Sequence, residues 1–154
     1  MRTRLRRLRV GGREFTWRAV ICHVPGELDC HRGIRLRVWA GGKTSRPLQV
    51  DLVSRAWPAP WGACASDNAY PQPHDVRAII VFALANGWQC DARGGVFLVT
   101  EGEHVNALEL PDFLVTDRIQ VPEAADPSAR VVEAFERSSR ENTTTQADSG
   151  GPPR

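Results

Sequence analysis

The stretch PQPHDVRAIIVFALANGW, residues 71–88, predicts one amphipathic helix that covers the rest of the fold. Gln72 can sit at the N-cap, and Pro73 suits the first helical position, where its missing N–H needs no partner. Asp75 suits the first turn, because the helix N-terminus favours negative charge. Gly87 is a natural stop after the last turn. Five apolar residues share one face at helical spacing and should cover a sheet: Val76, Ile79, Ile80, Ala83 and Leu84.

Val81 and Phe82 lie off that apolar face, on two different sides of the helix. They either widen the buried arc, beneath a tryptophan-rich loop, or belong to a surface for a partner. We therefore take Phe82 as a candidate binding residue.

Alternating apolar and polar residues predict three strands before this helix, within residues 13–24, 32–40 and 46–54, joined as an antiparallel meander. Two further strands are expected after it, within 94–102 and 112–121. The fold class is therefore α+β, with an antiparallel sheet of about five strands and one main helix on one face. The strand residues expected to face the helix are Phe15, Trp17, Ala19, Ile21, Ile34, Leu36, Val38, Leu48, Val50 and Leu52.

The chain divides by composition into three parts. Residues 1–12 form a basic N-terminal arm, and 13–120 form the single α+β domain. Residues 121–154 form a C-terminal tail with a short helix near 129–138. We expect disorder after about residue 140, where polar residues, Gly and Pro dominate.

The stretch CHVPGELDCH, residues 22–31, places two Cys-His pairs around a Pro-Gly turn and raises the question of a zinc site. Strand parity argues against one. A loop that pairs residue 24 with 27, or with 29, keeps Cys22 on the outer face and Cys30 on the core face. The pair then shares neither a disulfide nor a zinc tetrahedron. We expect all four cysteines to be free thiols in a reducing compartment, with no metal and no cofactor.

The outer face of the predicted sheet carries several charged residues. If residue 24 pairs with 27, Glu14 lies opposite Arg37. If Leu36 meets Val50, Arg35 meets Asp51, and such opposite charges stabilise a sheet. Residues 1–50 hold 12 basic and three acidic residues (+9), and the remainder holds eight and 15 (−7), which gives the net charge of +2. The face is either a solvated surface of matched charges or an arginine surface for phosphate.

Three functions stay open at this level. The first is a non-catalytic binding or interaction module, for a protein partner or a second copy, using Phe82 and the loop tryptophans Trp57 and Trp61. The second is nucleic-acid binding through the basic arm and the outer face. The third is an enzyme with a site in the 55–72 loop, although no known catalytic motif occurs, which favours a non-catalytic role. The arginines of the second hypothesis are Arg4, Arg6, Arg7, Arg18, Arg35 and Arg37.

No apolar run is long enough to cross a membrane, and no signal-peptide pattern follows the basic N-terminus, so we expect a cytoplasmic protein that does not bind membranes.

The helix and its flanking strands, within about residues 33–100, resemble a group of small, uncharacterised bacterial proteins of actinobacterial type. Members share a strand, a helix of the form P-x-D-V-x-x-x-I-x-x-A-x-x-x-G-W, and a final hairpin. The resemblance implies an α+β fold and no particular activity, since its motif consists of helix-start, core and helix-stop residues. The matching residues are Pro73, Asp75, Val76, Ile80, Ala83, Gly87 and Trp88.

Overall fold

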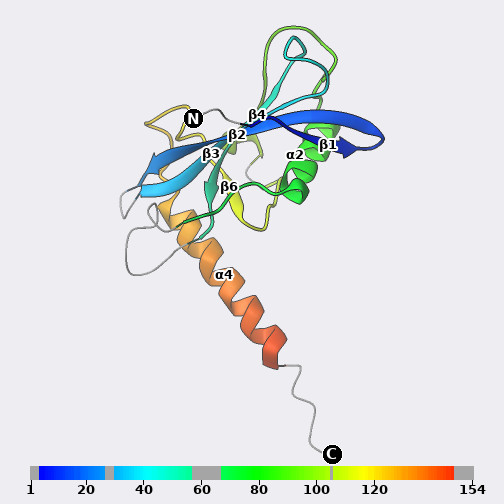
Figure 1. Cartoon of the computed structure of the whole chain (residues 1–154). Coiled ribbons are helices and arrows are strands. Elements are labelled where there is room, and N and C mark those ends of the chain that lie inside the picture. The colour runs from blue at the N-terminus through cyan, green and yellow to red at the C-terminus, as the bar shows by residue number, and fades with distance from the viewer. Residues whose placement is uncertain (1–3, 27–29, 57–66, 105, 148–154) are drawn as a thin grey trace, which may run out of the picture.

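A computed structural model describes residues 4–26, 30–56, 67–104 and 106–147 of the chain. These residues form an α+β fold with one mixed sheet and three helices (Figure 1). The strands are β1 (Arg6–Val10), β2 (Arg13–Pro25), β3 (Cys30–Trp39), β4 (Leu48–Ser54), β5 (Phe97–Val99) and β6 (Phe113–Val115). The helices are α2 (Pro73–Ala85), α3 (Glu101–His104) and α4 (Ser128–Ala147).

The sheet has six strands and is mostly antiparallel, whereas the sequence predicted about five strands, all antiparallel. Its strand order is β1-β2-β3-β4-β5. The short strands β5 and β6 both pair with β4. The pair β4–β5 is parallel. These two strands are parallel because the segment that joins them, which contains α2, crosses the sheet and returns the chain to the end at which β4 began. The strand β4 therefore lies in the interior of the sheet, and all seven of its residues are buried.

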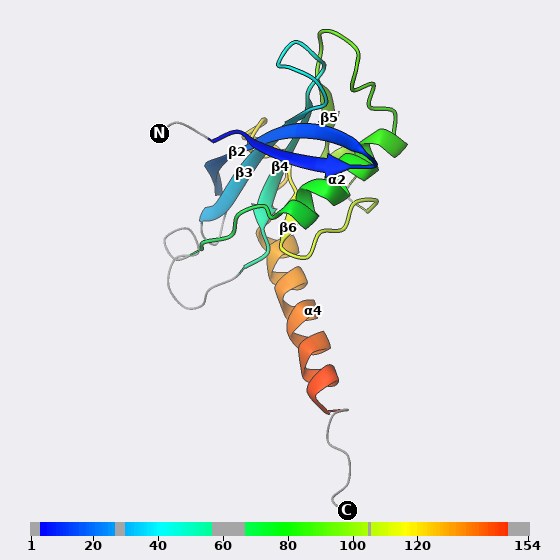
Figure 2. The ribbon, with the colours of Figure 1, turned by 45° about the vertical axis from the view of Figure 1, so that its right-hand side comes forward.

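The predicted helix is confirmed at both ends. Gln72 is the N-cap, Pro73 opens the helix, and the Asp75 carboxylate accepts the Gln72 N–H at 2.8 Å. Gly87 follows the last turn with φ of 98°, a conformation that favours glycine. Figure 2 shows α2 lying against the sheet, and its face from Val76 to Ala83 is buried there.

The main core lies between α2 and the face of the sheet that we call the core face. Its strand residues match the predicted set except Ile21, which is 51% exposed, and the helix residue Leu84 is also exposed. Ile21 is exposed because burial changes faces along β2: Val24, three residues on, is fully buried on the opposite side. There it packs in a second apolar cluster with Val53 and Val131, beneath the start of α4.

Both ends of the predicted domain need correction. The segment interpreted as a basic arm contains β1, which pairs with β2 along its whole length. The predicted short C-terminal helix is the 20-residue α4, which continues past the expected onset of disorder to Ala147. Figures 1 and 2 show α4 projecting away from the sheet. Each of Thr143, Thr144 and Thr145 donates its hydroxyl hydrogen bond to the carbonyl four residues earlier.

The β2–β3 hairpin has the predicted parity but a different register. Val24 pairs with His31 and Pro25 with Cys30, so the pairing is shifted by four or by two residues from the predicted registers, which paired residue 24 with 27 or with 29. Arg18, not Glu14, therefore lies opposite Arg37. The β3–β4 pairing is as predicted, with Leu36 opposite Val50 and Arg35 opposite Asp51.

The cysteine prediction is wrong for Cys30. Cys30 is disulfide-bonded, whereas Cys22 and Cys90 are free thiols, and Cys64 lies outside the described residues. Parity excludes only a bridge between Cys22 and Cys30, and Cys22 is indeed not the partner. The prediction of free thiols assumed a reducing compartment, whereas disulfides persist in an oxidising one.

Candidate nucleic-acid interface

The register of the sheet gathers arginines from three strands on the face opposite α2, which we call the arginine face. The pairing places Arg7 and Arg9 of β1 on this face, beside Glu14 and Thr16 of β2. It continues through Arg18 of β2 to β3 and β4. Three sequence-predicted binding residues lie together on this face: Arg18, Arg35 and Arg37.

Arg18 and Arg37 lie directly opposite each other across β2 and β3. Like charges in that position destabilise a sheet. In the described part of the chain, neither guanidinium has a carboxylate partner. Arg37 donates a hydrogen bond to the neutral Gln49 Oε1 at 2.7 Å, and Arg18 lies over the ring of Trp39, 5.6 Å from its centroid. Neutral groups therefore hold these two arginines in place, and no carboxylate among the described residues neutralises their positive charge.

Arg35 differs, because its charge is matched. Its guanidinium donates two hydrogen bonds to Asp51, Nε to Oδ1 at 2.8 Å and Nη2 to Oδ2 at 3.0 Å. These bonds raise the pKa of Arg35, and Asp51 is almost fully buried. Arg35 Nη2 also donates to Gln120 Oε1 at 2.9 Å, which ties the segment after β6 to the face. Arg35 is therefore a structural member of the surface.

A hollow of about 360 Å³ opens at the β1 end of the arginine face. Trp39 contributes to it together with Leu5 and Thr16, and two cationic side chains, Arg7 and Lys43, border it. The Trp39 side chain is largely buried, with Arg18 over its ring, so its main role here is to position Arg18.

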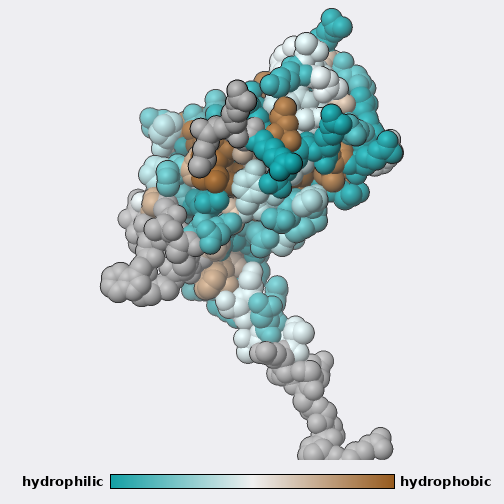
Figure 3. All heavy atoms as spheres, in the orientation of Figure 1, coloured by the Kyte–Doolittle hydropathy of each residue, from teal (hydrophilic) through white to brown (hydrophobic). Residues whose placement is uncertain are grey.

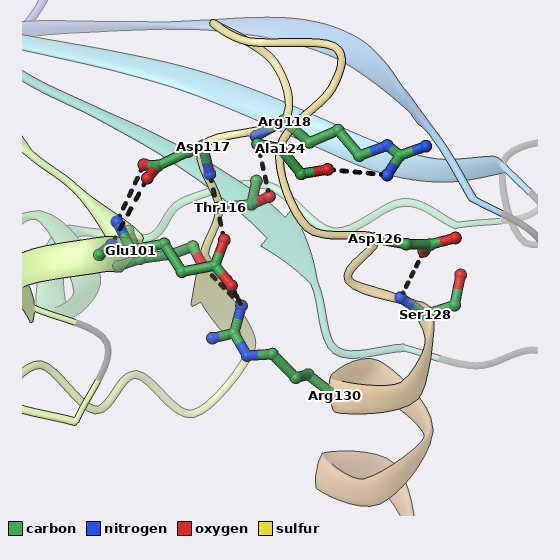
Figure 4. A network of polar contacts seen from close by, with 10 residues as sticks. Glu101, Thr116, Asp117, Arg118, Ala124, Asp126, Ser128 and Arg130 are labelled. Atoms are coloured by element: carbon green, nitrogen blue, oxygen red, sulfur yellow. Dashed lines mark hydrogen bonds and ion pairs between the residues drawn. The ribbon is translucent and has the colours of Figure 1, made fainter.

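A network of polar contacts braces the opposite end of this face (Figure 4). The Asp117 carboxylate accepts the Glu101 and Gly102 N–H groups at the start of α3, at 2.9 and 3.4 Å. Glu101 in turn binds Arg130 of α4, Oε1 to Nη1 at 2.8 Å. Segments distant in sequence are thereby fixed to one another. The sequence alone did not predict a role for these residues, because they lie far apart in the chain and come together only in the folded structure.

Of the other residues that the sequence suggested for binding, Phe82 and Arg6 do not join the arginine face. Phe82 is half-buried, and its ring packs edge-on against His104 of α3 at a centroid distance of 5.3 Å. Trp57 and Trp61 lie outside the described residues. Arg6 points to the core side of β1, where its guanidinium lies over Trp17 and Tyr70 at 5.5 and 5.3 Å from the ring centroids.

A second hollow, of about 450 Å³, borders the 55–72 segment where the sequence allowed an enzyme site. Arg55, Tyr70 and Asp112 are among the described residues that line it. The described residues that line this hollow include no Ser–His or Cys–His pair of the kind that activates a nucleophile.

Comparison with known proteins gives no relative: no family model matches the sequence, and no curated protein or solved structure matches it significantly.

None of the helices described in the structure is long and apolar enough to cross a membrane. Hydrophilic residues dominate the surface seen in Figure 3, with smaller hydrophobic patches between them.

Proposed function

We propose that this protein is a non-catalytic binding module whose ligand is a single-stranded nucleic acid, bound across the arginine face. The observation that carries the proposal is the unneutralised pair Arg18 and Arg37. The pair opposes sheet stability and creates a local positive potential. Residues that break a local rule of stability without compensation are expected at functional sites.

The form of the surface supports a single strand over a duplex. Duplex grooves admit a helix or a two-stranded ribbon, whereas the arginine face is the broad side of a sheet. Single strands lie on such platforms, with phosphates on cationic side chains and bases on flat groups. Trp39 is covered, so the flat groups here are guanidinium planes, on which unpaired bases also stack. Arg9 and Lys43 extend the positive track beyond the central pair, whereas Arg7 there lies near Glu14.

The test is fluorescence anisotropy of a labelled 20-nucleotide single strand, as DNA and as RNA, titrated with the full chain at increasing salt. We expect binding at 50 mM salt that weakens steeply as salt rises, because arginines displace condensed counterions. Arg18→Gln and Arg37→Gln should each weaken binding and lower the magnitude of the salt slope by about 1. Arg77→Gln is the matched control, because Arg77 is an exposed arginine of α2, on the other side of the sheet.

Two results would overturn the proposal. One is no anisotropy change at 50 mM salt with either strand. The other is equal weakening by Arg77→Gln and Arg18→Gln, which would mean that net charge alone drives binding. Polyglutamate that competes as well as unlabelled oligonucleotide at equal charge would instead assign the surface to an acidic protein partner.

A further inference from the structure

A cluster of metal-ligating side chains lies on the other side of the sheet, at the N-terminus of α2. His74, Asp75 and Asp112 each offer one ligand atom, and these atoms all lie within 4.8 Å of one another. His74 and Asp75 come from the first turn of α2, and Asp112 comes from the residue that precedes β6. The cluster contains none of the arginines used above, so it is independent of the proposed function.

The central ligand, Asp75, is fully buried, with an exposed fraction of 0%. Its Oδ2 accepts the Gln72 N–H at 2.8 Å, which fixes the orientation of the carboxylate. Its Oδ1 is also buried and has no hydrogen bond among the described residues. A buried carboxylate oxygen without a partner is costly, and an unmet group of this kind calls for an explanation. The imidazole of His74 lies beside Oδ1, with Nε2 at 3.3 Å.

The spacing suits a metal ion. Two ligands bonded to a tetrahedral Zn²⁺ at about 2.0–2.1 Å lie about 3.4 Å apart, close to the 3.3 Å between His74 Nε2 and Asp75 Oδ1. Asp112 completes the set from an exposed position, with a carboxylate oxygen within 4.8 Å of the other two ligand atoms. Its backbone is fixed, because the Asp112 carbonyl accepts the Arg55 N–H at 2.9 Å.

An approach from solvent also exists. Asp112 and Gln72 line the hollow of about 450 Å³, so this hollow reaches one side of the cluster from solvent. One imidazole and two carboxylates are a donor set typical of Zn²⁺, Fe²⁺ or Mn²⁺. We propose that His74, Asp75 and Asp112 bind a divalent transition-metal ion, with water at its remaining coordination positions.

The same distances suit a simpler arrangement, an ion pair between protonated His74 and Asp75 that needs no metal. The two arrangements differ in their response to metal and in the role of Asp112, which the ion pair does not use.

The test is calorimetric titration of the full, EDTA-treated and dialysed chain with Zn²⁺, repeated with Co²⁺ followed by its visible absorption. We expect one ion per chain at this cluster, and at least a tenfold loss of affinity in His74→Ala and in Asp112→Asn. Both residues are exposed, so both variants should fold, as circular dichroism will check. His23→Ala is the matched control, because His23 is an exposed histidine of β2 outside the cluster.

No bound ion at 1 mM Zn²⁺ would overturn the proposal and leave the ion pair as the explanation. Wild-type affinity in both His74→Ala and Asp112→Asn would overturn it as well, because any bound ion would then sit elsewhere. Asp75→Asn is a further probe: it retains the shape of the helix start, and the proposal requires it to lose the ion.

Discussion

Leu36 and Arg37 are neighbours on β3, and their side chains point to the two faces of the sheet, on which different interactions dominate. Leu36 points to the core face and is completely buried between the sheet and α2. Arg37 points to the arginine face, opposite a second arginine, and is held by the amide of Gln49. One face is specified by apolar burial and the other by the pairing of charges. A change of equal size should therefore have different consequences on the two faces.

The difference shows which property of the sequence controls each face. Burial on the core face depends only on alternation, and a strand cannot slip by one residue without exposing all its apolar side chains. Charge pairing on the arginine face depends on which residues lie opposite, and so on loop length. A shift of two residues leaves the core face intact and gives every charge a new partner.

The largest effect should come from Leu36→Ala. Removing most of a fully buried side chain leaves a cavity between β3 and α2, and such changes cost about 2–5 kcal/mol. Urea denaturation should show a lower midpoint with an unchanged slope. Val20→Ala is the control, because Val20 lies on the arginine face of β2 and is partly exposed. A loss in Val20→Ala as large as that in Leu36→Ala would contradict the distinction between the faces.

Much of the fold could be predicted because its signals are local. The ends of α2 follow from Gln72, Pro73 and Gly87, whose preferences act within one turn of helix. The core face follows from alternation. The strand within 94–102 was predicted, but the parallel direction of β5 was missed, because a three-residue strand carries no sign of its direction, which is set by the α2 crossover. The disulfide of Cys30 was missed because parity within one hairpin says nothing about segments elsewhere.

The second effect, on the arginine face, should come from Asp51→Asn. Asp51 is buried and accepts two hydrogen bonds from Arg35, so the substitution leaves a half-buried guanidinium without its charge partner. We expect a loss of about 1–3 kcal/mol in the free energy of unfolding. Gln120→Ala removes only the outer hydrogen bond of Arg35 and should cost clearly less. Equal losses in the two variants would show that the charge of Asp51 does not matter.

The candidate site was predicted in part. Arg18, Arg35 and Arg37 were placed on one face by parity alone, and Arg35 was matched correctly to Asp51 by aligning Leu36 with Val50. The pair Arg18 and Arg37 was missed, because the true β2–β3 register moves Glu14 away from Arg37. On its other side Glu14 lies near Arg7 of β1, Oε1 to Nε at 3.8 Å. Phe82 was a weaker inference, because nothing in the sequence indicates that α3 supplies His104 to cover it.

A smaller effect should come from Val131→Ala, which tests the part of the outer side that is apolar. Val131 of α4 is fully buried against Val24 and Val53, where α4 covers the end of the sheet. Loss of its two methyl groups should cost about 1–2 kcal/mol. Val132→Ala is the matched control, since it gives the same gain in helix propensity at a less buried position. No difference between the two variants would mean that α4 does not stabilise the sheet.

The smallest effect should come from Arg13 and Asp91, an ion pair at the open edge of the core face, where Arg13 lies beside Phe15. Hydrogen bonds from Arg13 hold the pKa of Asp91 below its usual range. A carboxylate with a lowered folded-state pKa contributes stability that is complete above its unfolded value of about 3.9 and is lost as pH falls through the folded value. Thermal melts should therefore show a small difference between wild type and Asp91→Asn near neutral pH, and this difference should shrink as the pH falls below the unfolded value of Asp91.

Arg13→Gln should reproduce that pH profile, and the double variant should add little, because each single change already breaks the pair. A difference that persists unchanged to pH 2 would mean that Asp91 acts through its shape and not its charge. The pair also refines the comparison of the faces. Arg13 and Asp91 belong to the side that α2 covers, yet both side chains are open to solvent, where water and salt screen an ion pair. Solvent exposure at each position, more than the face itself, therefore decides how much a charge contributes to stability.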